Sequence, residues 1–286
     1  MTKSVVRVEH VSKNYRLGEQ QVRAVNDISL SIQPGVFLAI SGPSGSGKTT
    51  LLNLIGCIDR PTSGDIYINE QNVGGMSDNE LAALRLRSIG FIFQTFNLLP
   101  VLSAAENVEY PLLQRSDLTT AERRERVDFF LEIVGLSERK NNRPNQLSGG
   151  QRQRVAIARA LAGSPSIVLA DEPTANLDKK TGIGILKLMK KINEQMKTTF
   201  IFSTHDRHVV ERADRIVKVE DGLIKGLGVR RDGEWILIRP RTVQAMDFSD
   251  PVTVIVTEPE TGSEPESGSV TDSDFLEPVS TRSESS

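Results

Sequence analysis

The sequence predicts an α/β fold with a mostly parallel central sheet, an N-terminal antiparallel β subdomain and an α-helical subdomain. Three observations in its 286 residues support this prediction. Strand-like alternation dominates residues 1–70, helix-capping boxes recur between residues 77 and 122, and unbroken apolar segments at 36–40 and 167–170 alternate with helical patterns. Buried strands that alternate with helices imply a parallel sheet covered on both faces.

The N-terminal segments show a period of two. Residues 5–8 and 25–32 alternate apolar and polar side chains, and residues 65–68 do so after the turn at 61–64. With this period, one face of each strand packs against a core and the other meets water. We therefore expect these strands to form the antiparallel β subdomain.

Helical patterns fill the middle of the chain. A Ser or Thr followed three residues later by Glu is the spacing of a capping box. It opens or precedes a helical pattern three times, in Ser77 with Glu80, Ser103 with Glu106, and Thr119 with Glu122. We expect residues 77–160 to be mainly helical, with the helical subdomain at about 95–160.

Strands and helices alternate again beyond Pro165. Residues 167–170 form an unbroken apolar segment, a helical pattern follows around 180–196, and residues 199–203 form a second apolar segment. Both segments have the length and composition of strands that are buried on both faces. They complete the expected parallel sheet.

Composition excludes several classes of protein. No apolar run approaches the ~20 residues that a bilayer crossing needs, and the N-terminus lacks the apolar segment of a secretory signal. The single cysteine, Cys57, allows no intramolecular disulfide, which fits a reducing compartment. We therefore expect a cytoplasmic protein.

Charge divides the chain into a basic body and an acidic tail. Residues 1–246 carry a formal charge of +7 and residues 247–286 carry −9. The tail is rich in Ser, Thr, Pro, Gly and acids and has too little apolar surface to offset its ordering entropy, so we expect disorder over 257–286. A charge of +7 over so many residues does not by itself select a partner.

A C-terminal annex, residues 229–256, lies between the main domain and this tail. Two short alternations, at 235–238 and 252–256, predict strands there. The sequence thus divides into a main domain over 1–228, the annex and the tail.

A glycine-rich loop follows the apolar segment at 36–40, and a helix-like stretch at 48–55 leaves it. The loop matches the phosphate-binding P-loop pattern in residues Gly42, Pro43, Ser44, Gly45, Ser46, Gly47, Lys48 and Thr49, with Thr50 adjoining. Its backbone N–H groups surround phosphates, Lys48 bridges the outer phosphates, and the Thr49 hydroxyl holds Mg²⁺. This context favours nucleotide binding over an accidental glycine-rich turn.

Two acids end the apolar segment at 167–170. A parallel strand delivers them to the carboxyl edge of the sheet, where such sheets bind ligands. We expect Asp171 to hold Mg²⁺ through its hydration shell and Glu172 to activate the attacking water as a general base. The alternative is that both acids only cap the following turn.

A second helix N-terminus, the signature loop at residues 147–151, also suits an anion. Ser148 and Gln151 form a capping box, and Gly149 and Gly150 expose backbone donors at the start of an apolar-periodic helix. Taken alone, the motif would be an ordinary helix cap.

Together these motifs resemble the ATP-binding cassette (ABC) ATPases. The P-loop, the signature loop, the acidic segment 171–178 and the Ser-Thr-His-Asp segment 203–206 occur in the order and spacing of that family. Residues 89–100 and 106–113 resemble the branch that serves lipoprotein release and macrolide export, with cell-division relatives close by. The resemblance covers residues 2–228. It implies a P-loop NTPase core of the ABC ATPase fold that hydrolyses ATP with Mg²⁺.

The resemblance also implies roles for single residues. Tyr15 corresponds to the aromatic that stacks on adenine, with a core aromatic as the alternative. Gln94 would contact Mg²⁺ or the attacking water and sense the γ-phosphate. His205 would bind the γ-phosphate and orient Glu172.

One cassette leaves a side of the γ-phosphate open. The resemblance implies that a second copy closes it, in a head-to-tail C₂ dimer that holds each ATP between one P-loop and the partner's residues 148–150. Asp178 lies in the loop that crosses this interface in the family, and here Asn176 stands where Ser is commoner.

A transport ATPase without a membrane span needs a separate permease subunit. We expect residues 94–100 to border a groove for a cytoplasmic helix of that subunit, which would place the protein peripherally on the inner or plasma membrane. The apolar Phe96, Leu98 and Leu99 either form this surface or are buried inside the cassette.

The alternative function is a regulatory ATPase that gates a cell-division or cell-wall-hydrolase membrane partner without moving cargo. We expect no nucleic-acid partner, because the sequence shows one cassette and no long coiled-coil insertion.

Overall fold

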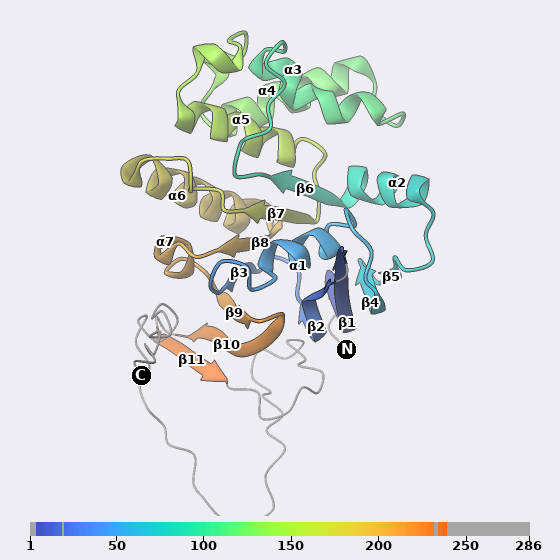
Figure 1. The fold of residues 1–286 in the computed structure, drawn as a ribbon. Helices are drawn as coiled ribbons and strands as arrows, with labels where there is room; N and C mark the ends of the chain where they lie inside the picture. The colour runs from blue at the N-terminus through green and yellow to red at the C-terminus, as the bar shows by residue number, and fades with distance from the viewer. Residues whose placement is uncertain (1–3, 19, 232–233, 239–286) are drawn as a thin grey trace, which may run out of the picture.

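The computed structural model of the chain describes residues 4–18, 20–231 and 234–238. Two sheets and a helical layer build the fold (Figure 1). The elements in chain order are β1 (Val6–Leu17), β2 (Gln20–Ile32), β3 (Phe37–Ser41), α1 (Lys48–Ile55), β4 (Ser63–Ile68), β5 (Gln71–Asn72), α2 (Asp78–Ser88), β6 (Ile89–Ile92), α3 (Ala104–Glu109), α4 (Thr120–Ile133), α5 (Gly149–Leu161), β7 (Ile167–Asp171), α6 (Lys179–Met196), β8 (Thr199–Thr204), α7 (Arg207–Val210), β9 (Arg215–Glu220), β10 (Leu223–Arg231) and β11 (Glu234–Ile238). Short 3₁₀ turns at Tyr110–Gln114, Ser137–Arg139 and Pro144–Gln146 connect the helices.

The main sheet has the order β11-β10-β9-β3-β8-β7-β6. The five strands from β9 to β6 run parallel, and β10 and β11 continue the sheet antiparallel at one edge. The mostly parallel sheet predicted from the sequence is therefore confirmed. Its register pairs Ser41 with Thr204 and Asp171 with Ser203, so the ends of β3, β8 and β7 meet at one edge.

The second sheet is antiparallel, with the order β2-β1-β4-β5. This confirms the predicted N-terminal β subdomain, although β1 and β2 are longer than the alternating patterns that predicted them. Helix α1 contacts strands of both sheets and lies between them (Figure 1).

Two apolar cores follow from the pleat of the main sheet, because successive side chains of a strand point to opposite faces. On β8, Phe200 and Phe202 pack against buried residues of α5, α6 and α7, whereas Ile201 packs against α1 and the antiparallel sheet. Cys57, whose pKa burial raises to about 11, belongs to the second core.

Every predicted capping box forms. Ser77, Ser103, Thr119 and Ser148 each accept a hydrogen bond from the backbone three residues on, and the Glu or Gln there returns one to the cap. Helices α3, α4 and α5 form the helical layer at the top of Figure 1. The expectation that residues 77–160 are mainly helical is confirmed, and the short strand β6, which was not predicted, lies within this segment and pairs with β7.

Gly90 explains how the helical layer meets the sheet. A Cβ atom there would lie 2.2 Å from the backbone oxygen of Ala160, a separation that no side chain tolerates. Glycine therefore lets the end of α5 approach the edge strand β6.

The sheet continues beyond residue 228. The strand predicted at 235–238 is present as β11, and its Trp235 is 5% exposed and belongs to the larger core. Strands β9 and β10 were not among the predicted segments. The strand predicted at 252–256 and the tail at 257–286 lie outside the described residues. Within the described part of the chain, no helix combines the length and apolarity that a bilayer crossing requires.

Candidate functional site

The P-loop occupies the turn from β3 to α1, where the sequence predicted it. Gly47 precedes α1 with φ 99°, and a Cβ atom there would lie 2.2 Å from the backbone oxygen of Ala24, so only glycine fits. The Lys48 ammonium donates to the backbone oxygens of Gly42 at 2.9 Å and Pro43 at 2.7 Å. These bonds hold the lysine beside the N-terminal end of α1, whose free N–H groups suit a phosphate.

Burial sets the charge properties of Lys48. Loss of hydration lowers the pKa of its ammonium below the usual 10.5, and the nearby carboxylates of Glu172 and Asp171 partly oppose this effect. An anionic ligand beside the ammonium would oppose the effect of burial in the same way as these carboxylates.

A metal ion of the hard, oxygen-seeking kind fits between α1 and β7. The Thr49 hydroxyl donates to Asp171 Oδ1 at 3.1 Å, which places two oxygens suited to such an ion or its hydration shell beside the P-loop. Mg²⁺ commonly takes one or two protein oxygens and completes its shell with water and substrate phosphates. Gln94 lies two residues beyond β6, the strand beside β7, with an exposed side chain whose amide oxygen suits the same kind of ion.

Glu172 and His205 form the second half of the site. Glu172 follows β7 with φ 44°, a left-handed conformation that costs of order 1–3 kcal/mol for a side chain of this kind and is typical of functional positions. Its Oε1 lies 2.6 Å from His205 Nδ1, and the Thr204 hydroxyl donates to Oε2 at 3.4 Å. The Glu172 side chain is 15% exposed and that of His205 is 72% exposed, so the pair has a sheltered carboxylate and an accessible ring.

Tyr15 lies half-buried on β1, and its hydroxyl donates to Asp59 Oδ2 at 2.7 Å. Asp59 also accepts from the Lys13 ammonium at 2.7 Å, and this ammonium lies 4.9 Å from the centre of the Tyr15 ring. Burial, followed by the hydrogen bond to Asp59, raises the pKa of the Tyr15 hydroxyl. The ring is thus fixed from two sides.

The signature loop lies apart from these residues. Ser148 caps α5, which contacts α3, α4, α6 and β6 in the helical layer. No hydrogen bond between described residues joins residues 148–151 to residues 42–50. Gly150 instead approaches Thr181, whose backbone N–H bonds to Asp178 at 3.0 Å. One chain therefore brings together the signature loop and the Asp178 loop, but not the signature loop and the P-loop.

Comparison with known proteins decides the family. A sequence model of the family described as ABC transporter matches residues 25–175. An ABC transporter ATP-binding protein of Methanocaldococcus jannaschii, MJ0796, is 48% identical over 224 residues, which are 77% of this chain and 95% of that protein. The chain belongs to the ABC transporter family.

Relatives with solved structures and further curated relatives support the same family assignment. A dimeric structure of the MJ0796 cassette in a post-hydrolysis state, bound to ADP and Pi, matches with a TM-score of 0.73 and 46% identity over 79% of this chain and 99% of that one. The lipoprotein-releasing system ATP-binding protein LolD 1 of Rhodopseudomonas palustris is 47% identical over 78% of this chain and 99% of that protein. The macrolide export ATP-binding/permease protein MacB of Syntrophobacter fumaroxidans is 48% identical over 77% of this chain, which spans 31% of MacB. The ABC ATPase fold is confirmed, and the cassette is an ATPase that uses ATP with Mg²⁺.

Two residues with no role in the sequence analysis hold the loop that contains Gln94. We call residues 94–100 the Gln94 loop. Asn176 donates to the backbone oxygen of Gln94 at 2.8 Å, and its departure from the commoner Ser was the one sequence signal for this contact. Arg159 of α5 donates to the backbone oxygens of Asn97 and Phe96, at 2.9 Å for Phe96. A basic residue on a helix gave no such signal.

Asn107 anchors the far end of the same loop. It is fully buried, accepts from the Leu99 N–H at 2.8 Å, and donates to the backbone oxygens of Leu99, Leu102 and Ser103. A buried amide with this many partners is a structural support for the loop.

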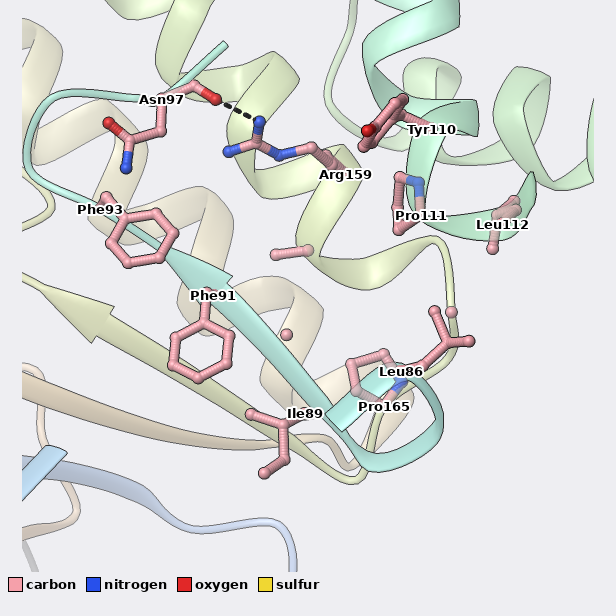
Figure 2. Close-up of a pocket in the computed structure, with 13 residues that line it drawn as sticks. Leu86, Ile89, Phe91, Phe93, Asn97, Tyr110, Pro111, Leu112, Arg159 and Pro165 are labelled. Carbon is pink, nitrogen blue, oxygen red and sulfur yellow. Dashed lines mark hydrogen bonds between the residues drawn. The ribbon is translucent and has the colours of Figure 1, made fainter. Parts of the chain in front are cut away.

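The Gln94 loop borders a groove of about 280 Å³ between β6, the end of α5 and the turn after α3 (Figure 2). Asn97 lines it, whereas Phe96, Leu98 and Leu99, which were expected either to form this surface or to be buried inside the cassette, do not. Phe96 and Leu98 are half-buried, Leu98 packs against the larger core, and Leu99 is 37% exposed. The groove is lined instead by residues such as Phe91, Phe93 and Tyr110.

Proposed function

We propose that this chain is the ATP-hydrolysing subunit of a transporter whose membrane permease is a separate polypeptide. The observation that carries the proposal is the pairing of Glu172 with His205 beside Thr49 and Asp171 at one edge of the sheet. Each of these residues matches a chemical requirement of phosphoryl transfer to water.

The P-loop and Lys48 bind the phosphates of ATP in this proposal. Backbone N–H groups of residues 42–50 face the phosphates, and Lys48 bridges the outer ones. Bound Mg²⁺, held by Thr49, by Asp171 through water and by Gln94, would neutralise charge on the phosphate oxygens. Tyr15 stacks on the adenine.

Glu172 accepts the proton of the attacking water. A general base must lie within hydrogen-bond reach of that water, and Glu172 stands one residue beyond Asp171 at the same strand end. His205 fixes the carboxylate through their 2.6 Å contact. Its exposed ring is free to bind the γ-phosphate.

A second copy completes each site. The separation of the signature loop from the P-loop within one chain supports this arrangement, as does the dimeric form of the MJ0796 cassette bound to ADP and Pi. Residues Ser148, Gly149, Gly150 and Gln151 would face the partner's γ-phosphate, and Asp178 would cross the interface. Hydrolysis then removes the ligand that holds the two copies together, and the opening drives the permease.

The permease docks at the groove beside the Gln94 loop and holds the cassette on the cytoplasmic face of the inner or plasma membrane. The names of the relatives support this assignment, since one belongs to a lipoprotein-releasing system and another combines ATP-binding and permease parts for macrolide export. These names favour transport of lipoproteins, macrolides or peptides over regulation of a cell-division partner.

The substitution Glu172→Gln tests the catalytic and dimer assignments together. We expect it to retain ATP binding, to lower kcat by roughly 10²–10⁴-fold because the general base is lost, and to produce a stable dimer in Mg-ATP. The measurements are phosphate release and size-exclusion chromatography with light scattering. Glu194→Gln, an exposed acid on α6, is the matched control. Unchanged turnover in Glu172→Gln would remove Glu172 as the base, and a strictly monomeric variant would remove the sandwich dimer.

A further inference from the structure

One charged side chain lies in the otherwise uncharged groove beside the Gln94 loop. Of the described residues that line the groove, Arg159 alone carries a charge, and the others are apolar or neutral. Figure 2 shows its guanidinium between Asn97 and Tyr110, above the aromatic rings of Phe91 and Phe93. These two rings stack at 5.7 Å, so the floor of the groove is flat and apolar.

The charge of Arg159 is not balanced within the described residues. Burial lowers the pKa of its guanidinium, and no carboxylate opposes this effect. No ion pair joins it to an acid in the described part of the chain. A half-buried charge without a counterion is costly, and a carboxylate with good geometry removes most of that cost.

Arg159 also has donors to spare. A guanidinium has five N–H donors in a planar fork. Two of them bond to the backbone oxygens of Asn97 and Phe96, and these bonds are the only ones it makes to described residues. The remaining donors can bind a carboxylate while the first two keep hold of the loop.

We propose that the groove receives a helix of the membrane subunit that carries an Asp or Glu among apolar residues, and that this carboxylate pairs with Arg159. The proposal rests on the proposed function, because it names the chemistry of the partner at the docking groove. The apolar floor accepts the hydrophobic side chains of that helix, and the guanidinium selects its acid.

The same residue links the partner to the catalytic site. Phe96 and Asn97, whose carbonyls Arg159 holds, have left-handed φ values of 62° and 48°, and Gln94 lies two residues before Phe96. Arg159 is on α5, which begins at the signature loop, and Arg152 near the start of this helix lies 5.5 Å from the Phe96 ring centre. A carboxylate on Arg159 therefore connects the partner to the Gln94 loop and to the signature helix through one side chain, and Arg159 acts as a positioning residue.

The test measures binding of the full chain to the integral-membrane subunit that co-purifies with it, reconstituted in lipid nanodiscs. We expect Arg159→Gln to weaken binding by at least ~30-fold, the size expected when a buried charge pair loses one member. Arg159→Lys, which keeps the charge but loses the planar fork, should bind more tightly than Arg159→Gln and less tightly than the natural chain. Arg124→Gln, an exposed arginine on α4, is the control and should bind as the natural chain does. Thermal melting of each variant verifies folding.

A charge exchange identifies the partner's acid. In the Arg159→Glu chain, we expect replacement of one Asp or Glu in the cytoplasmic segments of the membrane subunit by Lys to restore binding at least ~10-fold, because the pair is rebuilt with reversed signs. If no such replacement restores binding, or if Arg159→Gln binds as tightly as the natural chain, the proposal is wrong.

A photo-crosslinking residue at Tyr110, which lines the groove and is 50% exposed, separates this failure from failure of the proposed function. Crosslinking to the membrane subunit without any effect of Arg159 would overturn only the carboxylate pairing. No crosslink at all would overturn docking of the membrane subunit at this groove, whereas the catalytic part of the proposed function is tested separately by Glu172→Gln.

Discussion

Lys48 is a buried lysine that we expect to serve ligand binding. The residue is 7% exposed, and its ammonium donates to the neutral backbone oxygens of Gly42 and Pro43. These direct hydrogen-bond partners are neutral, so a bound phosphate would give the ammonium a charged partner in direct contact. Because only the folded chain presents the site, ATP at 100 times its Kd should stabilise the protein by about 2.7 kcal/mol.

We expect Lys48 and Tyr15 to bind different parts of the nucleotide, the phosphates and the adenine respectively. We expect Lys48→Ala to weaken binding of both ATP and inorganic tripolyphosphate at least ~10-fold, because a charge-assisted contact to phosphate is lost. Tyr15→Ala should weaken the binding of ATP by a similar factor, because stacking on the adenine is lost, and should leave the affinity for tripolyphosphate unchanged. Isothermal titration with both ligands measures this difference. Tyr15→Phe keeps the ring and serves as the control. An equal loss of both ligands in Tyr15→Ala would contradict adenine stacking.

The pKa of Lys48 adds a pH dependence. A deprotonated lysine cannot bridge phosphates, and burial places its pKa below the usual 10.5. The affinity for tripolyphosphate in the natural chain should therefore fall as the pH rises, at a lower pH than an exposed lysine would require.

At the scale of elements, α5 joins three functional regions. Its cap belongs to the signature loop, its Arg159 holds the Gln94 loop, and its last turn contacts β6 across Gly90. A movement of this helix is therefore transmitted to all three regions, because interiors packed at this density do not deform continuously.

Substitution of two glycines by alanine should change the stability of the protein in opposite directions, because Gly90 is needed for close packing whereas Gly184 only lowers the helix propensity of α6. Gly90→Ala should destabilise the protein by roughly 1–3 kcal/mol, since the added methyl group meets the Ala160 backbone and forces overpacking. Gly184→Ala, on α6 with open space around it, should instead stabilise it by about 0.5–1 kcal/mol. Urea denaturation of the two variants measures both signs. A neutral Gly90→Ala variant would show that α5 and β6 can separate without cost.

At the scale of the whole molecule, the antiparallel hairpin of β10 and β11 extends the sheet past the boundary predicted at residue 228. Trp235 on β11 is buried in the core shared with α5 and α6, and the Arg230 guanidinium lies 5.7 Å from the centre of its ring. We therefore propose that the main domain includes this hairpin.

Two truncations test the boundary. Removal of all residues after Arg230 deletes Trp235, and loss of a buried aromatic costs about 3–5 kcal/mol, so Tm should fall by at least ~5 °C. Removal of all residues after Ile238 leaves every described strand intact and should preserve both Tm and ATPase activity. Differential scanning calorimetry compares the two. If the two truncated chains have the same Tm, the C-terminal boundary of the main domain lies at residue 228, as first predicted.

Much of the predicted nucleotide site could be located from the sequence, because each of its elements is built from residues that are close together in the chain. A strand, a glycine-rich turn and a helix N-terminus build the P-loop within a dozen residues, and each capping box closes within four. Asp171 and Glu172 were placed correctly at the sheet edge because a parallel strand must end there. The family, the fold and the ATPase activity follow from the order of these local motifs along the chain.

Only the tertiary structure decides what holds the Gln94 loop. Arg159 is 62 residues from Asn97 in the chain, and Asn176 is 82 residues from Gln94. No periodicity or spacing in the sequence predicts such contacts. They depend on how the helical layer packs against the sheet, and Gly90 permits that packing by its close approach to Ala160. The sequence by itself therefore determined the local elements of the predicted phosphate site. The packing of distant segments decided which side chains connect that site to the groove, and it left the Arg159 guanidinium there without an ion pair to any acid of the described residues.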